Sequence, residues 1–467
     1  MYFANYSIQC YMPKIHFIAI GGAAMHNLAL ALHFQGYKIS GSDDEIYEPS
    51  KSLLDQQGIL PEKFGWFPEK ITKDLDCVIV GMHARSDNPE LLKAQELGVR
   101  IESYPSFLYE HSKNKQRIVI AGSHGKTSIT SMVLHVLKNL HKKFDYLVGA
   151  RIEGFELMAS LSDAPIIVIE GDEYLASPID RRAKFLLYQP HIALISGIAW
   201  DHINVYPTFE SYTSSFKELI QSMPKAGSLL YDETDEILNQ LSESCPDHTD
   251  KTGYSAHPSY IKNGKTILKG LDGTDYEIQI FGDHSLKNLN GARLICEQVG
   301  VSNTDFYKSI QSFKGAAKRL ELVGKSDNCL LYKDFAHAPS KVMATTEALK
   351  KQYPQSKLIA CLELHTFSSL NPAFLPQYAH SLNSADIAVV YLSEHAREIK
   401  RMDRLDEGQV QNYFKHPNLT ILREANDLKA WLLQHAWMDT NLLMMSSGTF
   451  DGLDLTDLAK QMNLSVQ

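Results

Sequence analysis

The chain lacks any apolar run that approaches the roughly 20 residues needed to cross a bilayer. Its first residues lack the basic stretch followed by an apolar stretch that marks a signal peptide. Cysteine is scarce, and the six cysteines include no C-x-x-C pair, which argues against a disulfide framework and against a zinc site. These absences predict a cytoplasmic protein with reduced thiols and no membrane insertion.

The chain also has fewer basic than acidic residues. The 46 lysines and arginines are outnumbered by 55 aspartates and glutamates, which gives a formal net charge of -9 at pH 7. This balance argues against nucleic acid or an anionic membrane as a general partner. With 467 residues, 44% of them hydrophobic and 22% charged, the chain has the size and composition of a globular protein of about three domains.

The stretch "RIVIAGSHGKTSIT" (residues 117–130) joins a short apolar strand to an amphipathic helix through a glycine turn. In this setting the backbone N–H groups of residues 122–126 would point at phosphate oxygens, aided by the helix dipole. Lys126 would neutralise the β- and γ-phosphates, and the Thr127 hydroxyl would hold Mg²⁺. The stretch therefore predicts an ATP site, although Gly122 and Gly125 are closer together than in the usual G-x-x-x-x-G-K-[ST] loop.

A second candidate nucleotide site lies near the N-terminus. Residues 15–20 form a strand candidate, glycines follow at 21 and 22, and Asp43 comes about 20 residues later, as in a dinucleotide-binding fold. The glycine fingerprint is imperfect, because Ala19 and Ala24 stand where glycines are expected. An ordinary strand–helix turn is therefore an equal alternative.

Acidic and imidazole groups follow two further apolar runs. Glu170, Asp172 and Glu173 come after "APIIVI", and Asp201 and His202 come after "PHIALISGIAW". The carboxyl ends of buried parallel strands meet at one crevice, so these groups predict a metal site in the block that holds the glycine loop. Ordinary solvation of loops by charged residues is the alternative.

The order of strand and helix candidates predicts an α/β fold of three domains. Residues 1–114 form a Rossmann-like domain, and residues 115–314 form a central domain with a parallel sheet of the P-loop ATPase type. A small antiparallel insertion is expected between residues 227 and 280, where short polar strands alternate with turns. Residues 315–467 form a second Rossmann-like domain.

A series of segments, in the correct order, is similar to the motifs of the Mur ligase family. "AGSHGKTSIT" resembles its short phosphate loop, so the close glycine spacing is a family variant. "IEGDEY", "AWDHINVYP", "GDHSLKNLNGA", "KRLE" and "YKDFAHAP" resemble motifs further along the chain, and "GSDDEIYEPSKSLLDQQGI" resembles the first-domain segment of the members that use UDP-N-acetylmuramate. Each motif is weak alone, and the ordered set is specific.

The resemblance implies an ATP-dependent ligase that forms an amide bond through an acyl phosphate, with ATP, Mg²⁺ and UDP-N-acetylmuramate bound. It assigns catalysis to Lys126, Glu173 and His202, and Mg²⁺ to Thr127, Glu173 and His202. The residues implied for ATP are Gly122, Ser123, His124, Gly125, Lys126, Thr127, Ser128, Asn288, Arg319 and Asp334. Those implied for the UDP-sugar are Gly21, Gly22, Asp43, His83 and Arg85.

The segment "DEYLASPIDRRAKFLLYQP" resembles the branch that attaches L-alanyl-γ-D-glutamyl-meso-diaminopimelate to UDP-N-acetylmuramate in peptidoglycan recycling. Guanidinium groups can bind the several carboxylates of such a tripeptide. The residues implied for the peptide are Tyr174, Asp180, Arg181, Arg182, His337 and His365. Two alternatives stay open, namely L-alanine as the acceptor and mutual pairing of residues 180–182 in a surface turn. Thr366 departs from both branches, which leaves the last peptide residue open.

Lys217 lies fifteen residues after His202, where several family members carry a carbamylated lysine that bridges to metal. An ordinary solvated lysine on a helix is the favoured alternative. Two other classes of function are also open, a regulatory P-loop ATPase and a nucleotide-sugar-binding module with an inactive ATP site. The sequence does not indicate the oligomeric state.

Overall fold

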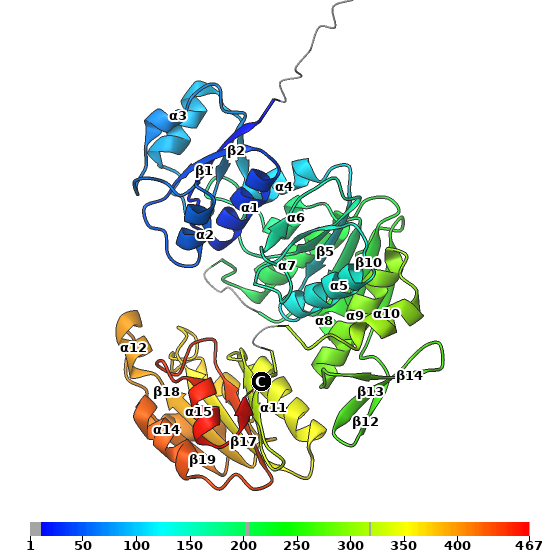
Figure 1. The fold of residues 1–467 in the computed structure, drawn as a ribbon, viewed down its shortest axis with the longest axis vertical. Helices are drawn as coiled ribbons and strands as arrows, with labels where there is room; N and C mark the ends of the chain where they lie inside the picture. Colours follow the sequence, from blue (N-terminus) through cyan, green and yellow to red (C-terminus); the bar gives the residue numbers. More distant parts are fainter. Residues whose placement is uncertain (1–10, 201–204, 317–318, 467) are drawn as a thin grey trace, which may run out of the picture. The chain divides into compact units, whose positions relative to one another are not determined.

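The computed structural model describes residues 11–200, 205–316 and 319–466. The chain divides into two compact units, the first Met1–Ser255 with Asn290–Ser302 and the second Ala256–Leu289 with Asn303–Gln467. Helix α9 (Asp283–Gln298) begins in the second unit and ends in the first. Figure 1 labels the helices and strands of both units.

The first unit begins with a four-stranded parallel sheet in the order β2-β1-β3-β4. Its strands are β1 (Lys14–Ile18), β2 (Lys38–Ser42), β3 (Cys77–Val80) and β4 (Ile101–Ser103). Its helices are α1 (Ala23–Phe34), α2 (Ser50–Gln56), α3 (Pro89–Leu97) and α4 (Tyr104–His111), with a 3-10 turn at Pro68–Lys70. The strand order reverses next to β1, and ligands of such sheets bind at the carboxyl ends of the strands at this point. The predicted Rossmann-like sheet is confirmed.

The central sheet of the first unit has the order β11-β10-β9-β5-β8-β6-β7. Its strands are β5 (Gln116–Ala121), β6 (Asp145–Leu147), β7 (Ala159–Ser160), β8 (Ile166–Glu170), β9 (Ile192–Ile195), β10 (Ser228–Asp232) and β11 (Asp250–Tyr254). All pairs are parallel except β6 with β7. Ile118, Val119 and Ile120 of β5 are fully buried, as expected for branched residues in a strand covered on both faces.

Helices α5 (Lys126–Asn139), α6 (Lys184–Leu187), α7 (Phe209–Gln221) and α8 (Glu236–Ser242) accompany this sheet. Because β5 lies between β8 and β9, the segments that follow these three strands meet at one edge of the sheet. One hydrophobic core contains residues of both sheets, for example Phe17 of β1 and Val119 of β5. The predicted boundary at residue 114 lies between the two sheets along the chain, and the bounds of the three predicted domains stay a prediction.

Residues 228–254 correct one detail of the predicted insertion. The sequence predicts antiparallel structure from residue 227, but β10 and β11 are parallel strands of the central sheet. Strand β11 is exposed over most of its length at the sheet edge, which gives it the polar composition of an insertion, whereas β10 is largely buried. The antiparallel sheet itself is confirmed and begins later, with β12 (Ser259–Lys262), β13 (Lys265–Lys269) and β14 (Asp275–Ile278).

The second unit also contains a seven-stranded sheet in the order β19-β18-β17-β20-β16-β15-β21. Its strands are β15 (Glu321–Lys325), β16 (Leu330–Asp334), β17 (Lys357–Leu364), β18 (Ile387–Leu392), β19 (Leu419–Leu422), β20 (Thr440–Met445) and β21 (Ser465–Val466). Five strands are parallel, and β15 and β21 add an antiparallel edge. Strand β20 is the last of the parallel strands in the sequence, yet it lies between β17 and β16, so the strand order reverses inside the sheet. An open parallel sheet with such a reversal is Rossmann-like, which confirms the prediction.

Helices cover both faces of this sheet (Figure 1). They are α11 (Pro339–Gln352), α12 (Glu394–Lys400), α13 (Glu407–Phe414), α14 (Ala425–Gln434) and α15 (Leu455–Gln461), with a 3-10 turn at Leu375–Tyr378. Helix α10 (Asn303–Ile310) instead contacts β14 of the antiparallel sheet, where Tyr307 stacks on Tyr276. No helix among the described residues of either unit has the length and apolar character to cross a membrane.

Candidate functional site

The glycine loop between β5 and α5 has the backbone that a phosphate cradle requires. Gly122 has φ +120° and Gly125 has φ +81°, a region that favours glycine. A Cβ added at Gly122 would lie 2.5 Å from the Ser196 hydroxyl oxygen, so the loop passes too close to the end of β9 for any side chain. Gly125 precedes α5, and no described side chain caps that helix end. The first N–H groups of α5 are therefore oriented to receive an anion.

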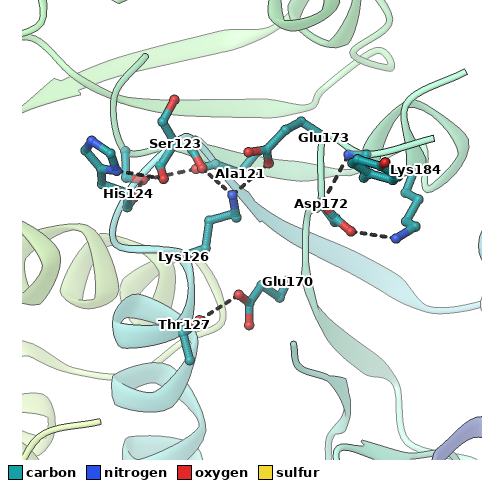
Figure 2. Close-up of polar contacts among 12 residues, drawn as sticks. Ala121, Ser123, His124, Lys126, Thr127, Glu170, Asp172, Glu173 and Lys184 are labelled. Carbon is teal, nitrogen blue, oxygen red and sulfur yellow. Dashed lines mark hydrogen bonds and ion pairs between the residues drawn. The ribbon is translucent and has the colours of Figure 1, made fainter. Parts of the chain in front are cut away.

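Lys126 is bonded to Glu173 and to its own loop (Figure 2). Its Nζ donates to Glu173 Oε2 and to the Gly122 carbonyl oxygen, each at 2.7 Å. The Glu173 side chain is 1% exposed. Burial acts to lower the pKa of Lys126, but the charge and hydrogen bond of Glu173 outweigh it and raise that pKa above its ordinary value. The structure therefore brings two of the predicted catalytic residues, Lys126 and Glu173, into contact, and Glu173 keeps the Lys126 ammonium charged.

Thr127 contacts a different carboxylate from the predicted one. Its hydroxyl donates to Glu170 Oε1 at 2.7 Å, and the backbone N–H of Gly149 donates to Glu170 Oε2 at 2.8 Å. The predicted metal pair was Thr127 with Glu173, whereas Glu173 is bonded to Lys126. Glu170 thus connects the loop to the segment that contains Gly149.

The oxygen donors beside the loop fit a nucleotide-bound Mg²⁺. This ion usually keeps several waters and takes one or two carboxylates besides phosphate oxygens, and Thr127 with Glu170 offers a hydroxyl and a carboxylate. No group of three His, Cys, Asp or Glu side chains within the described ranges could form an all-protein metal site. His202, the other predicted ligand, lies outside the described residues.

A second ion pair lies beside Glu173 (Figure 2). Lys184 Nζ donates to Asp172 Oδ2 at 2.6 Å, and the backbone N–H of Tyr174 donates to Asp172 Oδ1 at 3.1 Å. The Lys184 ammonium also lies 5.8 Å from the centre of the Tyr174 ring. Lys184 was not among the predicted site residues, although its segment was, because a lone lysine carries no motif signal.

Arg181 and Arg182, the two arginines predicted to bind the peptide, have different surroundings. Arg182 makes two bonds to Asp180, Nη2 to Oδ2 at 2.7 Å and Nε to Oδ1 at 3.0 Å. This hydrogen bond holds the pKa of Asp180 below its ordinary value. Asp180 and Arg182 therefore pair with each other, as the surface-turn alternative expects. The Arg181 side chain is exposed to solvent.

A cavity of about 740 Å³ lies at the carboxyl end of β1. Gly21, Gly22, Asp43 and His83, four of the five residues predicted for the UDP-sugar, line it. Burial raises the pKa of Asp43 to about 6, against the effect of the Gly21 N–H, which donates to its carboxylate at 2.7 Å.

The fifth predicted residue, Arg85, is outside this cavity. Its side chain is 83% exposed and pairs with Asp87 at 3.0 Å. Arg151 lines the cavity instead, in the segment that follows Gly149. The sequence patterns did not single out Arg151, because its segment carries no motif and reaches the cavity only through the fold.

The remaining predicted residues lie in the second unit. Asp334, 7% exposed, accepts from the N–H groups of Leu320 and Ala336, each at 2.7 Å. Burial raises the pKa of Asp334, while Arg319 acts to lower it. The Arg319 guanidinium lies 5.0 Å from the centre of the Phe335 ring. Arg319 and Asp334 are thus neighbours, as the resemblance implies.

Two histidines and one asparagine complete this set. His337 Nδ1 lies 2.9 Å from the Phe335 carbonyl oxygen, at the start of α11. His365 Nε2 lies 3.3 Å from the Ser447 hydroxyl, and burial lowers the pKa of His365. Asn288 is half-buried in α9.

Lys217 is exposed on α7. On the same helix Tyr212 and Phe216 are fully buried, and the Tyr212 hydroxyl contacts Ser123 and Glu173. The face of α7 that meets the loop is therefore not the one that carries Lys217. The structure gives no support to the carbamylated-lysine hypothesis, and it agrees with a solvated lysine.

The chain matches two family models over most of its first unit. Residues 14–116 match "Mur ligase family, catalytic domain", and residues 120–296 match "Mur ligase middle domain". It is similar to the UDP-N-acetylmuramate–L-alanyl-γ-D-glutamyl-meso-2,6-diaminoheptandioate ligase of Escherichia coli, at 27% identity over 96% of this chain and 99% of that protein. It is also similar to the UDP-N-acetylmuramate–L-alanine ligase of Caldicellulosiruptor bescii, at 32% identity over 83% of this chain and 85% of that protein.

Among solved structures, the fold is similar to that of a murein peptide ligase from Psychrobacter arcticus. The TM-score is 0.62 at 22% identity, over 97% of this chain and 100% of that chain. The family matches, together with the sheets and the loop between β5 and α5, assign the chain to the α/β enzymes of the ATP-dependent, amide-forming ligase class. The chain belongs to the Mur ligase family.

Proposed function

We propose that this protein joins UDP-N-acetylmuramate to L-alanyl-γ-D-glutamyl-meso-diaminopimelate in peptidoglycan recycling, in the cytoplasm. The carrying observation is that one compact unit contains both a phosphate loop with Lys126 bonded to Glu173 and a large cavity beside a second glycine turn. A ligase that activates a sugar-nucleotide carboxylate needs these two nucleotide sites. The choice of acceptor is supported by the end-to-end similarity to the Escherichia coli enzyme.

The chemistry follows from the poor reactivity of a carboxylate as an acyl donor. Transfer of the γ-phosphoryl group of ATP to the lactyl carboxylate would give an acyl phosphate. The peptide amine would then attack its carbonyl carbon, and phosphate would leave. Lys126, charged at neutral pH, would stabilise the negative charge that develops on the phosphoryl oxygens.

Mg²⁺ bound with ATP would neutralise part of the phosphate charge. Thr127, Glu170, Glu173 and His202 are the residues that we propose to hold it. Thr127 and Glu170 already lie together, and the loss of one bond between them would free a hydroxyl and a carboxylate oxygen. Asn288, Arg319 and Asp334 stay proposed ATP ligands, and the domain boundaries at residues 114 and 314 are likewise proposed.

The cavity beside β1 is the proposed site of the UDP-sugar. Gly22 would offer its backbone N–H group at the start of α1, which no described side chain caps, whereas the Gly21 N–H is bonded to Asp43 and Gly21 allows close approach of the ligand. Arg151 would pair with the diphosphate or the lactyl carboxylate. His83 lines the same cavity and would supply a hydrogen-bond donor.

The acceptor residues that we propose in the first unit are Tyr174, Arg181 and Lys184. His337 and His365 stay predictions from the family resemblance. Arg181 is directed to solvent and is therefore able to meet a carboxylate of the peptide. Lys184 is 19% exposed and is bonded to Asp172. It would offer a second positive charge near the metal carboxylates.

L-Alanine is the second candidate acceptor. Two observations favour it: the similarity to the Caldicellulosiruptor bescii enzyme, and the Asp180–Arg182 pair, which removes one of the two arginines that would bind a peptide carboxylate. A small amino acid would not need that arginine.

An ADP-release assay with UDP-N-acetylmuramate and L-alanine, dipeptide or tripeptide in parallel wells tests the proposal. We expect the tripeptide to give the highest kcat/KM. Preference for L-alanine would assign the chain to the alanine-adding branch. ADP release without sugar nucleotide would instead indicate a regulatory ATPase.

A further inference from the structure

The Tyr212 hydroxyl lies between the phosphate loop and Glu173. Its oxygen is 2.8 Å from the Ser123 hydroxyl oxygen and 3.4 Å from Glu173 Oε1. The backbone N–H of Ala199 donates to the Ser123 hydroxyl at 2.8 Å. Ser123, Glu173 and Tyr212 are all buried, with exposed fractions of 7%, 1% and 0%. These groups form a continuous polar chain inside the protein.

The chemistry of its two ends fixes the direction of every bond in this chain. Ala199 N–H can only donate, so the Ser123 oxygen accepts there and is free to donate its own hydrogen onward. A carboxylate can only accept, so the Tyr212 O–H donates to Glu173. Ser123 must then donate to Tyr212. The loop, α7 and the metal-side carboxylate are thereby joined by bonds of a single orientation, which reinforce one another.

Packing holds the Tyr212 ring independently of its hydroxyl. The ring makes edge contacts with Tyr206, at 5.2 Å between centroids, and with Phe216, at 5.3 Å. The Tyr206 hydroxyl donates to the Glu173 backbone carbonyl oxygen at 2.6 Å. Replacing Tyr212 by Phe would therefore leave the ring in place and remove only the bonds of its hydroxyl.

We propose that Tyr212 is a positioning residue that, with Ser123, sets the orientation of the Glu173 carboxylate and so the position of the Lys126 ammonium. One Glu173 oxygen faces Tyr212 and the other is bonded to Lys126. Without the hydroxyl, the carboxylate can rotate and follow Lys126, and the ammonium is held less well toward an incoming phosphate. This proposal depends on the proposed function in one respect, namely that the ligand of the phosphate loop is ATP.

The test compares Tyr212→Phe with Tyr104→Phe, which also removes a buried hydroxyl. The Tyr104 hydroxyl has no hydrogen-bond partner among the described residues, so this control matches the chemical change. Steady-state kinetics with UDP-N-acetylmuramate and tripeptide would give kcat and both KM values. Calorimetry with ATP alone and thermal unfolding would be recorded for each variant.

We expect Tyr212→Phe to lower kcat about tenfold, the effect of one hydrogen bond to a charged group, and to weaken ATP binding. The KM for UDP-N-acetylmuramate should stay unchanged, because that site is separate. Ser123→Ala should act in the same way and Ser123→Thr should restore most of the loss. The double variant should be no worse than either single one, because both act through one chain.

Equal behaviour of Tyr212→Phe and Tyr104→Phe would overturn the proposal. So would a uniform loss in kcat, both KM values and thermal stability, which would indicate a merely structural tyrosine. If the wild-type protein ligates no acceptor, the proposed function fails, but the comparison of ATP binding still decides the role of Tyr212.

Discussion

Thr127 and Glu170 share a hydrogen bond of 2.7 Å, whereas Lys126, the residue before Thr127, is bonded to Glu173 at the same distance. These consecutive residues are thus bonded to two different carboxylates, Glu170 at the end of β8 and Glu173 just after it. Glu170 also accepts from Gly149, next to the segment that lines the cavity. The two carboxylates should therefore have separable roles.

The first prediction separates them by isosteric substitution. Glu170→Gln removes the carboxylate charge and replaces one acceptor oxygen by an NH2 group, so either the bond from Gly149 is lost or the Thr127 hydroxyl must accept instead of donate. We expect a higher Mg²⁺ requirement and a higher KM for UDP-N-acetylmuramate. Glu173→Gln should also raise the Mg²⁺ requirement, since Glu173 is a proposed Mg²⁺ ligand, and should lower kcat further because it removes the charge beside Lys126. The kcat of both variants at saturating ATP and Mg²⁺ would show this difference, and equal kcat values would contradict it.

The second prediction concerns the loop lysine. Lys126→Ala should reduce ligation by roughly a hundred- to ten-thousandfold, the loss typical when a charge is removed from a phosphoryl or oxyanion transition state. Binding of UDP-N-acetylmuramate, measured by calorimetry, should remain nearly intact because its proposed site is the cavity beside β1. Loss of sugar-nucleotide binding in this variant would refute the separate assignment of the two sites.

The third prediction is a pH effect on stability. Burial raises the pKa of Asp43 to about 6 from its ordinary value of 3.8. Between these values the folded state binds more protons than the unfolded state, so the free energy of unfolding falls as pH rises through this window. Asp43→Asn should flatten this dependence, because the amide does not titrate. Chemical denaturation at pH 4.5 and pH 7 would measure it, and an unchanged slope would count against the buried carboxyl.

The fourth prediction compares two arginines. Arg151 lines the cavity, whereas Arg85 is exposed and paired with Asp87. Arg151→Ala should raise the KM for UDP-N-acetylmuramate about tenfold or more, as expected for a charge-assisted hydrogen bond. Arg85→Ala should change it by less than about twofold, because exposed ion pairs contribute little. The reverse order of effects would mean that the sugar nucleotide binds elsewhere.

Local features were predictable from the sequence, and pairings across the fold were not. Residues 122–127 were found because a glycine turn between a strand and a helix is coded within a few neighbouring residues. The contact of Thr127 with Glu170 instead of Glu173 depends on where β8 ends beside β5. No periodicity encodes that detail.

The same reason explains the residues that were missed. Tyr212 and Arg151 reach the proposed sites from distant segments, and neither lies in a recognisable motif. Arg85 shows the opposite case, since a polar residue after a buried strand fits the pattern of a ligand site even when its side chain turns to solvent. Edge strand β11 was misplaced because its exposed residues resemble those of a surface hairpin, and its largely buried neighbour β10 was misplaced with it.

The position of β20 has a consequence for how the chain reaches its fold. Strands β16 and β17 are consecutive parallel strands, yet β20 lies between them and pairs with both. During synthesis, both must keep an edge of unpaired N–H and C=O groups until residues 440–445 have been made. Closing the sheet is thus a late, long-range event, which favours slow folding of this part of the chain. A chain that stops before residue 440 would leave two half-sheets with exposed edges, a state prone to aggregation.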